Sequence, residues 1–392
     1  MSHKTLVWPF SFYFIISAAA AIYRPYLVLY YQDLSLTGAQ IGLLVGVAPL
    51  IAMVSLPLLT MLADRTNTHR FIMSLSLFIL VLGLFFFPYL NTFTLLFILT
   101  ILFSIFLSPL FPLANSAAMF MLAEKKELYG RIRMGGTIGF TIAATMAGAL
   151  VENYGLKFAF WGAAIIYAIA FFINRRLVYT EGIKTNTAES GRIRDLLKNG
   201  RFLILFLVGF TGGLSFVSNS TYLFPYLKEL GAGESTMGFA LTIGTIAEIP
   251  VLFFAGRFIK RFKVYAVLIF STVMIGLRFL LLGVAINPTF VVIVQLLHGF
   301  THPLLNIAGV TYADEYAPEG LRATAQGLFN TAMGGIGAAV GGFVGSLLLE
   351  GVGAKGMFLV FCLFVLVVLV IVGLIKRTLP PEDAGAPLTD SI

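Results

Sequence analysis

Residues 41–90 read IGLLVGVAPLIAMVSLPLLTMLADRTNTHRFIMSLSLFILVLGLFFFPYL, and this stretch decides the fold. Two apolar runs flank one short polar segment, LADRTNTHR at residues 62–70. Each run is long enough to cross a bilayer as a helix, because about 20 consecutive apolar residues span the hydrocarbon core. The polar segment has room only for a turn between two such helices. The stretch therefore predicts a helical hairpin in a membrane.

The same pattern continues along the whole chain. Of its 392 residues 59% are hydrophobic and 11% are charged, and the mean hydropathy is +0.95, whereas a typical soluble domain has roughly 25% charged residues. This composition excludes a soluble globular protein. We predict an all-α membrane protein with twelve transmembrane helices, at about residues 6–30, 38–62, 71–90, 93–120, 132–152, 157–178, 202–227, 236–257, 264–286, 289–313, 323–349 and 356–375.

Basic residues fall mainly in alternate loops of this arrangement. Of the 26 Lys and Arg, 21 lie on the side of the termini, Lys157, Lys228 and Lys355 lie on the other side, and Arg24 and Arg278 lie within spans. Cytoplasmic loops carry the excess of Lys and Arg, so both termini are expected in the cytoplasm and the protein in the cell (plasma or inner) membrane. The first span is expected to be a retained helix, since it lacks a signal-peptide cleavage pattern.

The two halves of the chain resemble each other weakly. Residues 25–27 (PYL) recur as 225–227, and residues 63–65 (ADR) correspond to 255–257 (AGR), at offsets of 200 and 192 residues. A parallel repeat of half the chain predicts two pseudo-symmetric six-helix bundles. The expected domains are an N-terminal bundle at 1–178, a cytoplasmic linker at 179–200, a C-terminal bundle at 201–377 and a cytoplasmic tail at 378–392.

Several motifs resemble those of one transporter superfamily. LADRTNTHR resembles the loop signature GxLADRxGRR of the major facilitator superfamily, with Thr60 and Asn67 in place of its glycines. This resemblance implies the major facilitator fold and secondary transport. Further strings resemble the branch that contains phenylpropionate permease, nucleoside:proton symporters and, more distantly, lactose permease: 129–136 (YGRIRMGG), 247–250 (AEIP), 295–301 (QLLHGFT) and 322–327 (RATAQG).

Charged residues at the cytoplasmic ends of the expected helices are candidates for gating. An acid and several cations at helix ends can pair with one another and with helix dipoles, and so latch one state. The alternative for this loop is a simple turn anchored by basic residues. The gating candidates are Asp64, Arg65, Arg70, Arg131 and Arg133.

Few ionisable side chains lie deep in a span, where burial is costly without a partner or a water-filled cavity. Glu248, Arg278 and His298 lie near the middle of their spans and match an acid, an arginine and a histidine of lactose permease. The resemblance implies that they couple transport to protons, together with His302. Thr301 stands where that permease has an acid, and its acid–arginine sugar clamp has no counterpart deep in spans four and five. Galactoside specificity is therefore not expected.

Polar side chains at helical spacing predict the lining of a central cavity. Gln295, His298, His302 and Asn306 follow one another at steps of three, four and four, and so share one helix face. A metal site is not expected there, because two histidines lack a third ligand. Arg24 has the alternative of reaching the lipid headgroups, and the amide and hydroxyl groups have the alternative of joining helices. The remaining candidates for substrate binding are Tyr13, Ser17, Arg24, Asn115, Asn219 and Tyr222.

These features predict a proton-coupled secondary transporter that carries a small polar solute by alternating access. In this hypothesis Glu248 takes up and releases the proton, Arg278 pairs with it, and His298 with His302 orients the substrate or relays protons. The substrate class stays open among nucleosides, sugars and aromatic or organic acids. The expected partners are the substrate, protons and the lipid bilayer but no nucleic acid. No cofactor is expected, and a functional monomer is the simplest expectation.

Other functions are weighed by the same sequence. Export by proton antiport is disfavoured, because the fifth span lacks the Gly-Pro pair that is typical of drug:proton antiporters, and lipid flipping would need a lateral opening. A non-transporting nutrient receptor on the same scaffold is the further alternative. An enzyme is not expected, because the chain has no HExxH or nucleophile-elbow motif, and ATP is not the expected energy source without GxxxxGK[ST].

Overall fold

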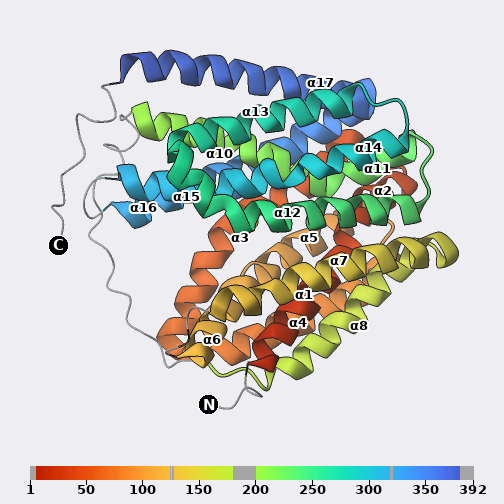
Figure 1. Ribbon diagram of the computed structural model, residues 1–392. Helices are drawn as coiled ribbons and strands as arrows, with labels where there is room; N and C mark the ends of the chain where they lie inside the picture. The colour runs from red at the N-terminus through yellow and green to blue at the C-terminus, as the bar shows by residue number, and fades with distance from the viewer. Residues whose placement is uncertain (1–5, 124, 126–127, 180–199, 318–320, 380–392) are drawn as a thin grey trace.

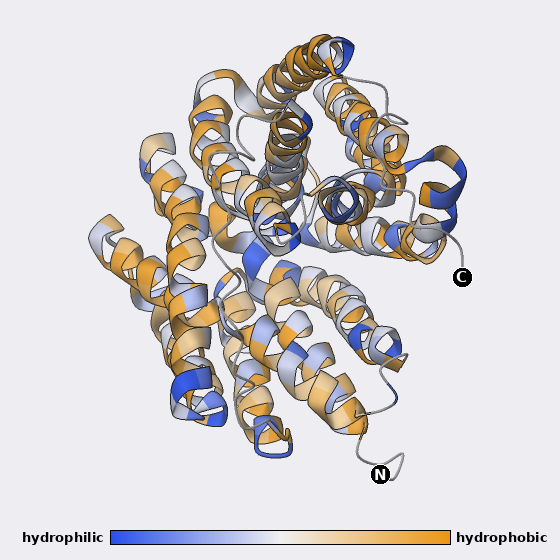
Figure 2. Ribbon diagram, turned by 90° about the vertical axis from the view of Figure 1, so that its left-hand side faces the viewer, coloured by the Kyte–Doolittle hydropathy of each residue, from blue (hydrophilic) through white to orange (hydrophobic). Residues whose placement is uncertain are grey.

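The computed structural model describes residues 6–123, 125, 128–179, 200–317 and 321–379. These residues form two groups of helices, one from residues 7–174 and one from residues 200–378 (Figure 1). Hydrophilic segments lie mainly at the helix ends and between the two groups (Figure 2). The expected division into two six-helix bundles stays a prediction. The expected linker lies outside the described residues except for its first and last residues, as does most of the expected tail.

Eleven helical spans in the described part of the chain are long and apolar enough to cross a membrane. They are Val7–Asp33, Gly38–Thr66, His69–Tyr89, Phe93–Leu122, Tyr129–Tyr154, Lys157–Asn174, Gly200–Glu229, Glu234–Phe262, Val264–Gly283, Pro288–Tyr316 and Thr324–Thr378.

The N-terminal group contains the elements α1 (Val7–Tyr23), η2 (Arg24–Tyr26), α2 (Leu27–Asp33), α3 (Gly38–Thr66), α4 (His69–Phe86), η3 (Phe87–Tyr89), α5 (Phe93–Leu107), α6 (Leu110–Leu122), α7 (Tyr129–Tyr154) and α8 (Lys157–Asn174). The C-terminal group contains α10 (Gly200–Val217), η5 (Ser218–Tyr222), α11 (Leu223–Glu229), α12 (Glu234–Phe262), α13 (Val264–Gly283), α14 (Pro288–Val294), η6 (Gln295–Phe300), α15 (His302–Tyr316), α16 (Arg322–Asn330), η7 (Thr331–Gly337) and α17 (Ala338–Thr378).

The described residues form eleven such spans instead of the expected twelve, because the last span unites two expected ones. The expected spans 323–349 and 356–375 are joined in one helical element of 55 residues. A straight helix of that length would measure about 80 Å, far more than the roughly 30 Å of a hydrocarbon core. The element turns at Gly353, whose φ of 71° breaks the helix. Gly342, before the turn, packs on α3, whereas Val365, after it, packs on α13.

The two groups touch closely at one end of their helices. We call it the distal end, because it lies opposite the start of α1 and the end of α17 and contains the turns after α2, η3, α7, α11 and α13. A Cβ built on Gly42 of α3 would lie 2.9 Å from the carbonyl oxygen of Phe343 on α17. Gly238 of α12 packs against the carbonyl oxygen of Ala144 on α7. Backbones of opposite groups therefore approach each other where only glycine leaves room.

Polar contacts join the groups at the same end. The hydroxyl oxygens of Thr145 and Thr242 lie 2.7 Å apart. The backbone amide of Ser235, in the first turn of α12, donates to the Glu152 carboxylate over 2.8 Å, so a residue of one group caps a helix of the other. These contacts close the distal end.

Gly238→Val is expected to open the distal end. The added side chain collides with the backbone of α7, and the groups must separate to accommodate it. Cys362 is the single cysteine of the chain, so a Cys362→Ser, Thr141→Cys background provides one reporter beside the contact. We expect faster labelling of this cysteine by a membrane-impermeant thiol reagent added on the distal side.

Gly256→Val is the matched control, because a Cβ at Gly256 of the same helix would meet no atom within 4 Å. Equal labelling rates in the Gly238→Val and Gly256→Val proteins would show that the glycine contact does not hold the distal end closed.

Candidate functional site

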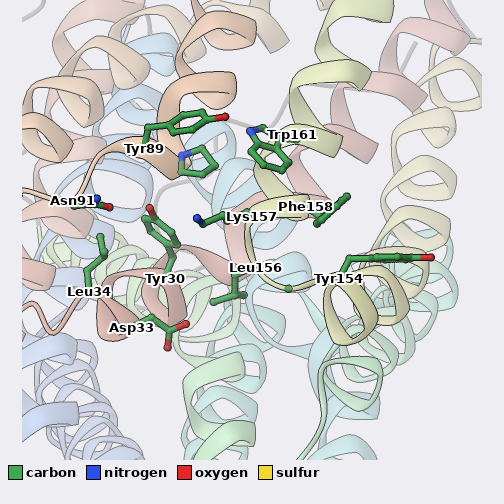
Figure 3. Close-up of a pocket in the computed structure, with 12 residues that line it drawn as sticks. Tyr30, Asp33, Leu34, Tyr89, Asn91, Tyr154, Leu156, Lys157, Phe158 and Trp161 are labelled. Carbon is green, nitrogen blue, oxygen red and sulfur yellow. The ribbon is translucent and has the colours of Figure 1, made fainter.

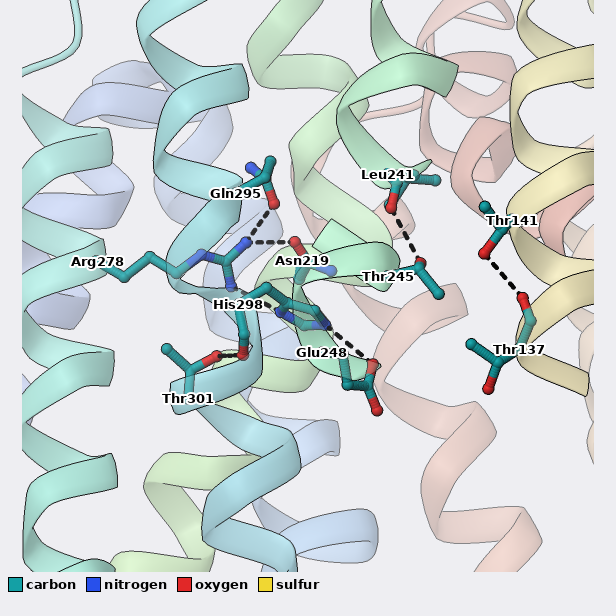
Figure 4. A network of polar contacts seen from close by, with 10 residues as sticks. All are labelled: Thr137, Thr141, Asn219, Leu241, Thr245, Glu248, Arg278, Gln295, His298 and Thr301. Atoms are coloured by element: carbon teal, nitrogen blue, oxygen red, sulfur yellow. Dashed lines mark hydrogen bonds and ion pairs between the residues drawn. The ribbon is translucent and has the colours of Figure 1, made fainter. Parts of the chain in front are cut away.

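Arg278 of α13 is the centre of a buried polar network in the C-terminal group (Figure 4). Its side chain is 2% exposed. One terminal nitrogen donates to Asn219 Oδ1 over 2.5 Å and to Gln295 Oε1 over 2.6 Å. The other lies 3.3 Å from His298 Nδ1. The guanidinium is thus surrounded by three neutral acceptors from two other spans.

Irregular backbone places these acceptors. Asn219 lies in η5, a π-helical turn, and π turns are frequent at functional sites. Gln295 and His298 lie in η6, a 3₁₀ segment in which side chains at i and i+3 share one face. The two side chains therefore reach the same guanidinium.

The expected continuous helix over 289–313 is wrong in this segment. The helix is broken at Thr301, one residue before α15 begins and shortly before Pro303, which cannot donate a backbone hydrogen bond. His302 lies beyond the break, and its ring packs on Phe216 of α10 with 5.0 Å between centroids. Asn306 lies half-buried farther along α15. The predicted four-residue stripe is therefore divided, and only its first two members contact Arg278.

His298 links this arginine to Glu248 of α12. An arginine can only donate hydrogen bonds, so His298 Nδ1 accepts and the ring proton resides on Nε2. That nitrogen lies 3.9 Å from Glu248 Oε2. Within the described residues Arg278 has no ion pair with Glu248, and the expected direct pair is replaced by an arrangement in which the histidine ring lies between them (Figure 4).

Glu248 lies on α12, which packs against α7 of the opposite group. Its side chain is 29% exposed, and the charge of Arg133 on α7 acts on its carboxylate. The same arginine acts on Tyr13 of α1. The expected role of Arg133 at the cytoplasmic gate stays a prediction, and the charge of this exposed residue also acts on candidate site residues of both groups.

A second polar cluster lies in the N-terminal group. Asn115 Oδ1 accepts hydrogen bonds from the hydroxyls of Tyr13 and Tyr129, the latter over 3.0 Å. Ser17 is buried against α7, where a Cβ on Gly136 would lie 2.9 Å from its hydroxyl oxygen. The sequence analysis missed Tyr129, although it begins the quoted motif at 129–136.

Two candidates are placed away from these clusters. Arg24 is exposed and interacts with Tyr23 and Tyr167 of its own group, so it has no partner in common with Arg278. Tyr222 is fully buried, and its hydroxyl bonds to the Gly342 carbonyl and to Ser346 Oγ on α17. This hydroxyl joins two helices.

Of the remaining gating candidates, Asp64, Arg65 and Arg70 lie around the turn between α3 and α4, and Arg131 lies in the first turn of α7. Asp64 Oδ1 lies 2.7 Å from Nε2 of the buried His69, which the sequence analysis missed. Arg70 donates to the Leu177 carbonyl over 2.8 Å and so ties this turn to the chain after α8. Arg65 and Arg131 are exposed. The turn is fixed mainly by contacts within its own group.

Two similar groups of apolar helices, with a buried charge network facing the partner group, define a polytopic membrane transporter. The model of the MFS_1-like family matches residues 7–360, and the chain belongs to this family of major facilitator superfamily transporters.

Individual relatives cover nearly the whole chain. The maltose permease of Geobacillus stearothermophilus is 28% identical over 93% of each chain. The probable 3-phenylpropionic acid transporter of Escherichia coli (strain K12) is 24% identical over 76% of this chain and 80% of its own. The crystal structure of the nucleoside transporter NupG superposes with a TM-score of 0.81 at 19% identity, covering 96% of this chain and 100% of that chain. The predicted superfamily and the all-α membrane fold are confirmed, whereas the twelve helices and the cytoplasmic termini stay predictions.

Proposed function

We propose that this protein is a proton-coupled symporter of a neutral polar solute, a sugar or a nucleoside, in the cell membrane. The observation that carries the proposal is the position of Glu248 on α12, which packs against α7 of the opposite group and holds the carboxylate 3.9 Å from His298, itself in contact with Arg278. A carboxylate that can gain a proton is thereby placed where the two groups face each other.

The hydrogen bonds that Arg278 already makes favour a neutral substrate. The terminal nitrogens of Arg278 already donate to Asn219, Gln295 and His298. A carboxylate substrate would need to displace one of these partners. The hydroxyl and amide groups of Tyr13, Tyr129 and Asn115 offer hydrogen bonds to sugar or nucleoside hydroxyls. The maltose permease and NupG relatives support this substrate class.

Proton coupling follows from the charge pair. An ionised Glu248 attracts Arg133 and favours the state in which the groups close around the site. Protonation removes this attraction, so the groups of the loaded, protonated protein can separate at the end opposite the distal contacts, where the solute and the proton both leave. A proton thus shifts the equilibrium between the two access states by the difference between its binding free energies in them.

A thermal-stability screen of the detergent-solubilised protein tests the substrate class. Ligands that bind the folded state raise its melting temperature. A ligand at a hundredfold excess over its Kd raises the free energy of unfolding by about 2.7 kcal/mol. We expect the largest shift from a sugar or nucleoside, larger at about pH 5.5 than at about pH 7.5, because the protonated carboxyl belongs to the loaded state. Glu248→Gln is expected to remove the pH dependence of this shift.

A hit among aromatic carboxylates that is lost in Arg133→Gln would overturn the neutral-substrate proposal and favour the organic acids expected as the other class. The relative that is a probable 3-phenylpropionic acid transporter favours this second candidate. Solute movement into vesicles in the direction opposite to the proton flow, rather than in the same direction, would instead support export by antiport.

A further inference from the structure

A cavity of about 750 Å³ opens at the distal end of the N-terminal group, outside the network described above (Figure 3). It is formed where the ends of α2 and α7, the turn after η3 and the start of α8 meet. Its polar lining includes Asp33, Asn91 and Lys157, and its remaining walls are largely aromatic. The cavity lies at the level where the helices end, which in a membrane is the interface with water.

The lining of the cavity contains one base and one acid, Lys157 and Asp33. Lys157 points its ammonium group between Tyr30 and Trp161 (Figure 3), and it forms no ion pair within the described part of the chain. The acid of the cavity, Asp33, is paired with Lys228 of the opposite group at 3.4 Å. One lysine charge is therefore left to attract an anion.

Aromatic rings at the rim of the cavity indicate that the rim lies at the level of the lipid headgroups. Trp161 lies 6.3 Å from Tyr89 and 5.6 Å from Phe158, measured between ring centroids. Its indole nitrogen donates to the Phe85 carbonyl over 3.2 Å. Tryptophan and tyrosine favour the headgroup level of a bilayer, where an apolar ring and a polar tip are both satisfied.

Two exposed apolar stripes lead away from this rim toward the middle of the membrane. On α8 the stripe below Trp161 is Ile165, Ile169 and Phe172, and on α4 the stripe below Tyr89 is Phe85, Leu82 and Phe78. The two helices pack side by side. Each stripe extends eleven residues from its ring, about 16 Å of helix, which matches one leaflet of roughly 15 Å.

We propose that this cavity binds the headgroup of an anionic phospholipid, with the acyl chains lying along the two stripes. The phosphate lies against Lys157, Asn91 offers a hydrogen bond to headgroup oxygens, and the rings of Tyr89 and Trp161 cover the glycerol region. Basic pockets between transmembrane helices bind lipid headgroups in this way. The site is independent of the transported solute.

Intrinsic fluorescence tests the proposal, because Trp8 and Trp161 are the two tryptophans of the chain. In Trp8→Phe protein, Trp161 at the rim is the single reporter. The protein is reconstituted into phosphatidylcholine vesicles that contain either brominated phosphatidylglycerol or the same amount of brominated phosphatidylcholine. We expect an about fivefold preference of the quenched site for the anionic lipid, the contribution of one basic residue.

Lys157→Met in the same background is expected to abolish the preference, with emission in unbrominated vesicles unchanged as the check on folding. Lys355→Met is the matched control, since this exposed lysine lies at the distal end of the other group, and it is expected to keep the preference. Equal quenching by the two brominated lipids in Trp8→Phe protein, or a preference that survives Lys157→Met, would overturn the proposal. Relief of quenching by millimolar glycerol phosphate would assign the cavity to a soluble phosphate ester instead.

Discussion

Glu248→Gln protein is expected to lose uphill accumulation of its substrate while still exchanging labelled for unlabelled substrate. Glutamine keeps the size and hydrogen bonding of the side chain but cannot ionise, so the site no longer binds a proton differently in the two access states. Without that difference the proton gradient does no work, and the inside-to-outside ratio falls to about one. Uptake into proteoliposomes under an imposed pH gradient, beside counterflow exchange, measures both quantities.

Glu234→Gln is the matched control. It removes a carboxylate from the first turn of the same helix, α12, and is expected to retain accumulation. Wild-type accumulation by the Glu248→Gln protein would remove Glu248 from the coupling step. Loss of exchange together with accumulation would make Glu248 a substrate ligand rather than a proton carrier.

Arg278→Gln is expected to abolish transport and to lower the melting temperature markedly. Asn219 Oδ1, Gln295 Oε1 and His298 Nδ1 all face one guanidinium. Each buried acceptor that is left without a donor costs about 1–3 kcal/mol, and one glutamine amide cannot reach all three. Arg278→Lys is expected to recover only part of the loss, because a compact ammonium lacks the planar fork of donors. Thermal unfolding and counterflow exchange check these expectations.

Arg261→Gln, at the exposed end of α12, is the control for loss of one positive charge from the same group and is expected to behave as wild type. If Arg278→Lys matched the wild-type protein in both measurements, a point charge would be sufficient and the three-acceptor geometry would not hold the site. An unchanged melting temperature in Arg278→Gln would contradict the network as a stabilising element.

Much of the fold could be predicted from hydropathy, because a span of about 20 apolar residues is visible in one window of sequence. The hairpin at residues 41–90 is an example. The breaks within spans were harder to predict. Pro109 begins the second part of the fourth span and Pro25 that of the first, yet Pro57 lies inside an uninterrupted α3. Neighbouring helices decide which proline bends a transmembrane helix.

The candidate site could be predicted only in part, because its geometry also depends on how neighbouring helices bend and pack. Spacing arguments assume one uniform helix, whereas a 3₁₀ segment holds His298 and a break at Thr301 precedes His302, whose ring packs on Phe216. Arg133 was assigned to the gate from its position near a span end. Its action on Tyr13 and Glu248 depends on how α7 packs between α1 and α12, which no local pattern contains. The roles of these residues stay predictions.

The glycine contacts at the distal end bear on how fast the protein can change state. At Gly42 and Gly238 the groups meet backbone to backbone, so few interlocked side chains must change rotamer when the helices part. Water that enters can hydrogen-bond to the uncovered carbonyl oxygens of Phe343 and Ala144, which replaces part of the lost contact energy. The barrier to opening then depends mainly on the contact area that is lost and little on the rearrangement of interdigitated side chains. Turnover is therefore expected to depend only weakly on temperature.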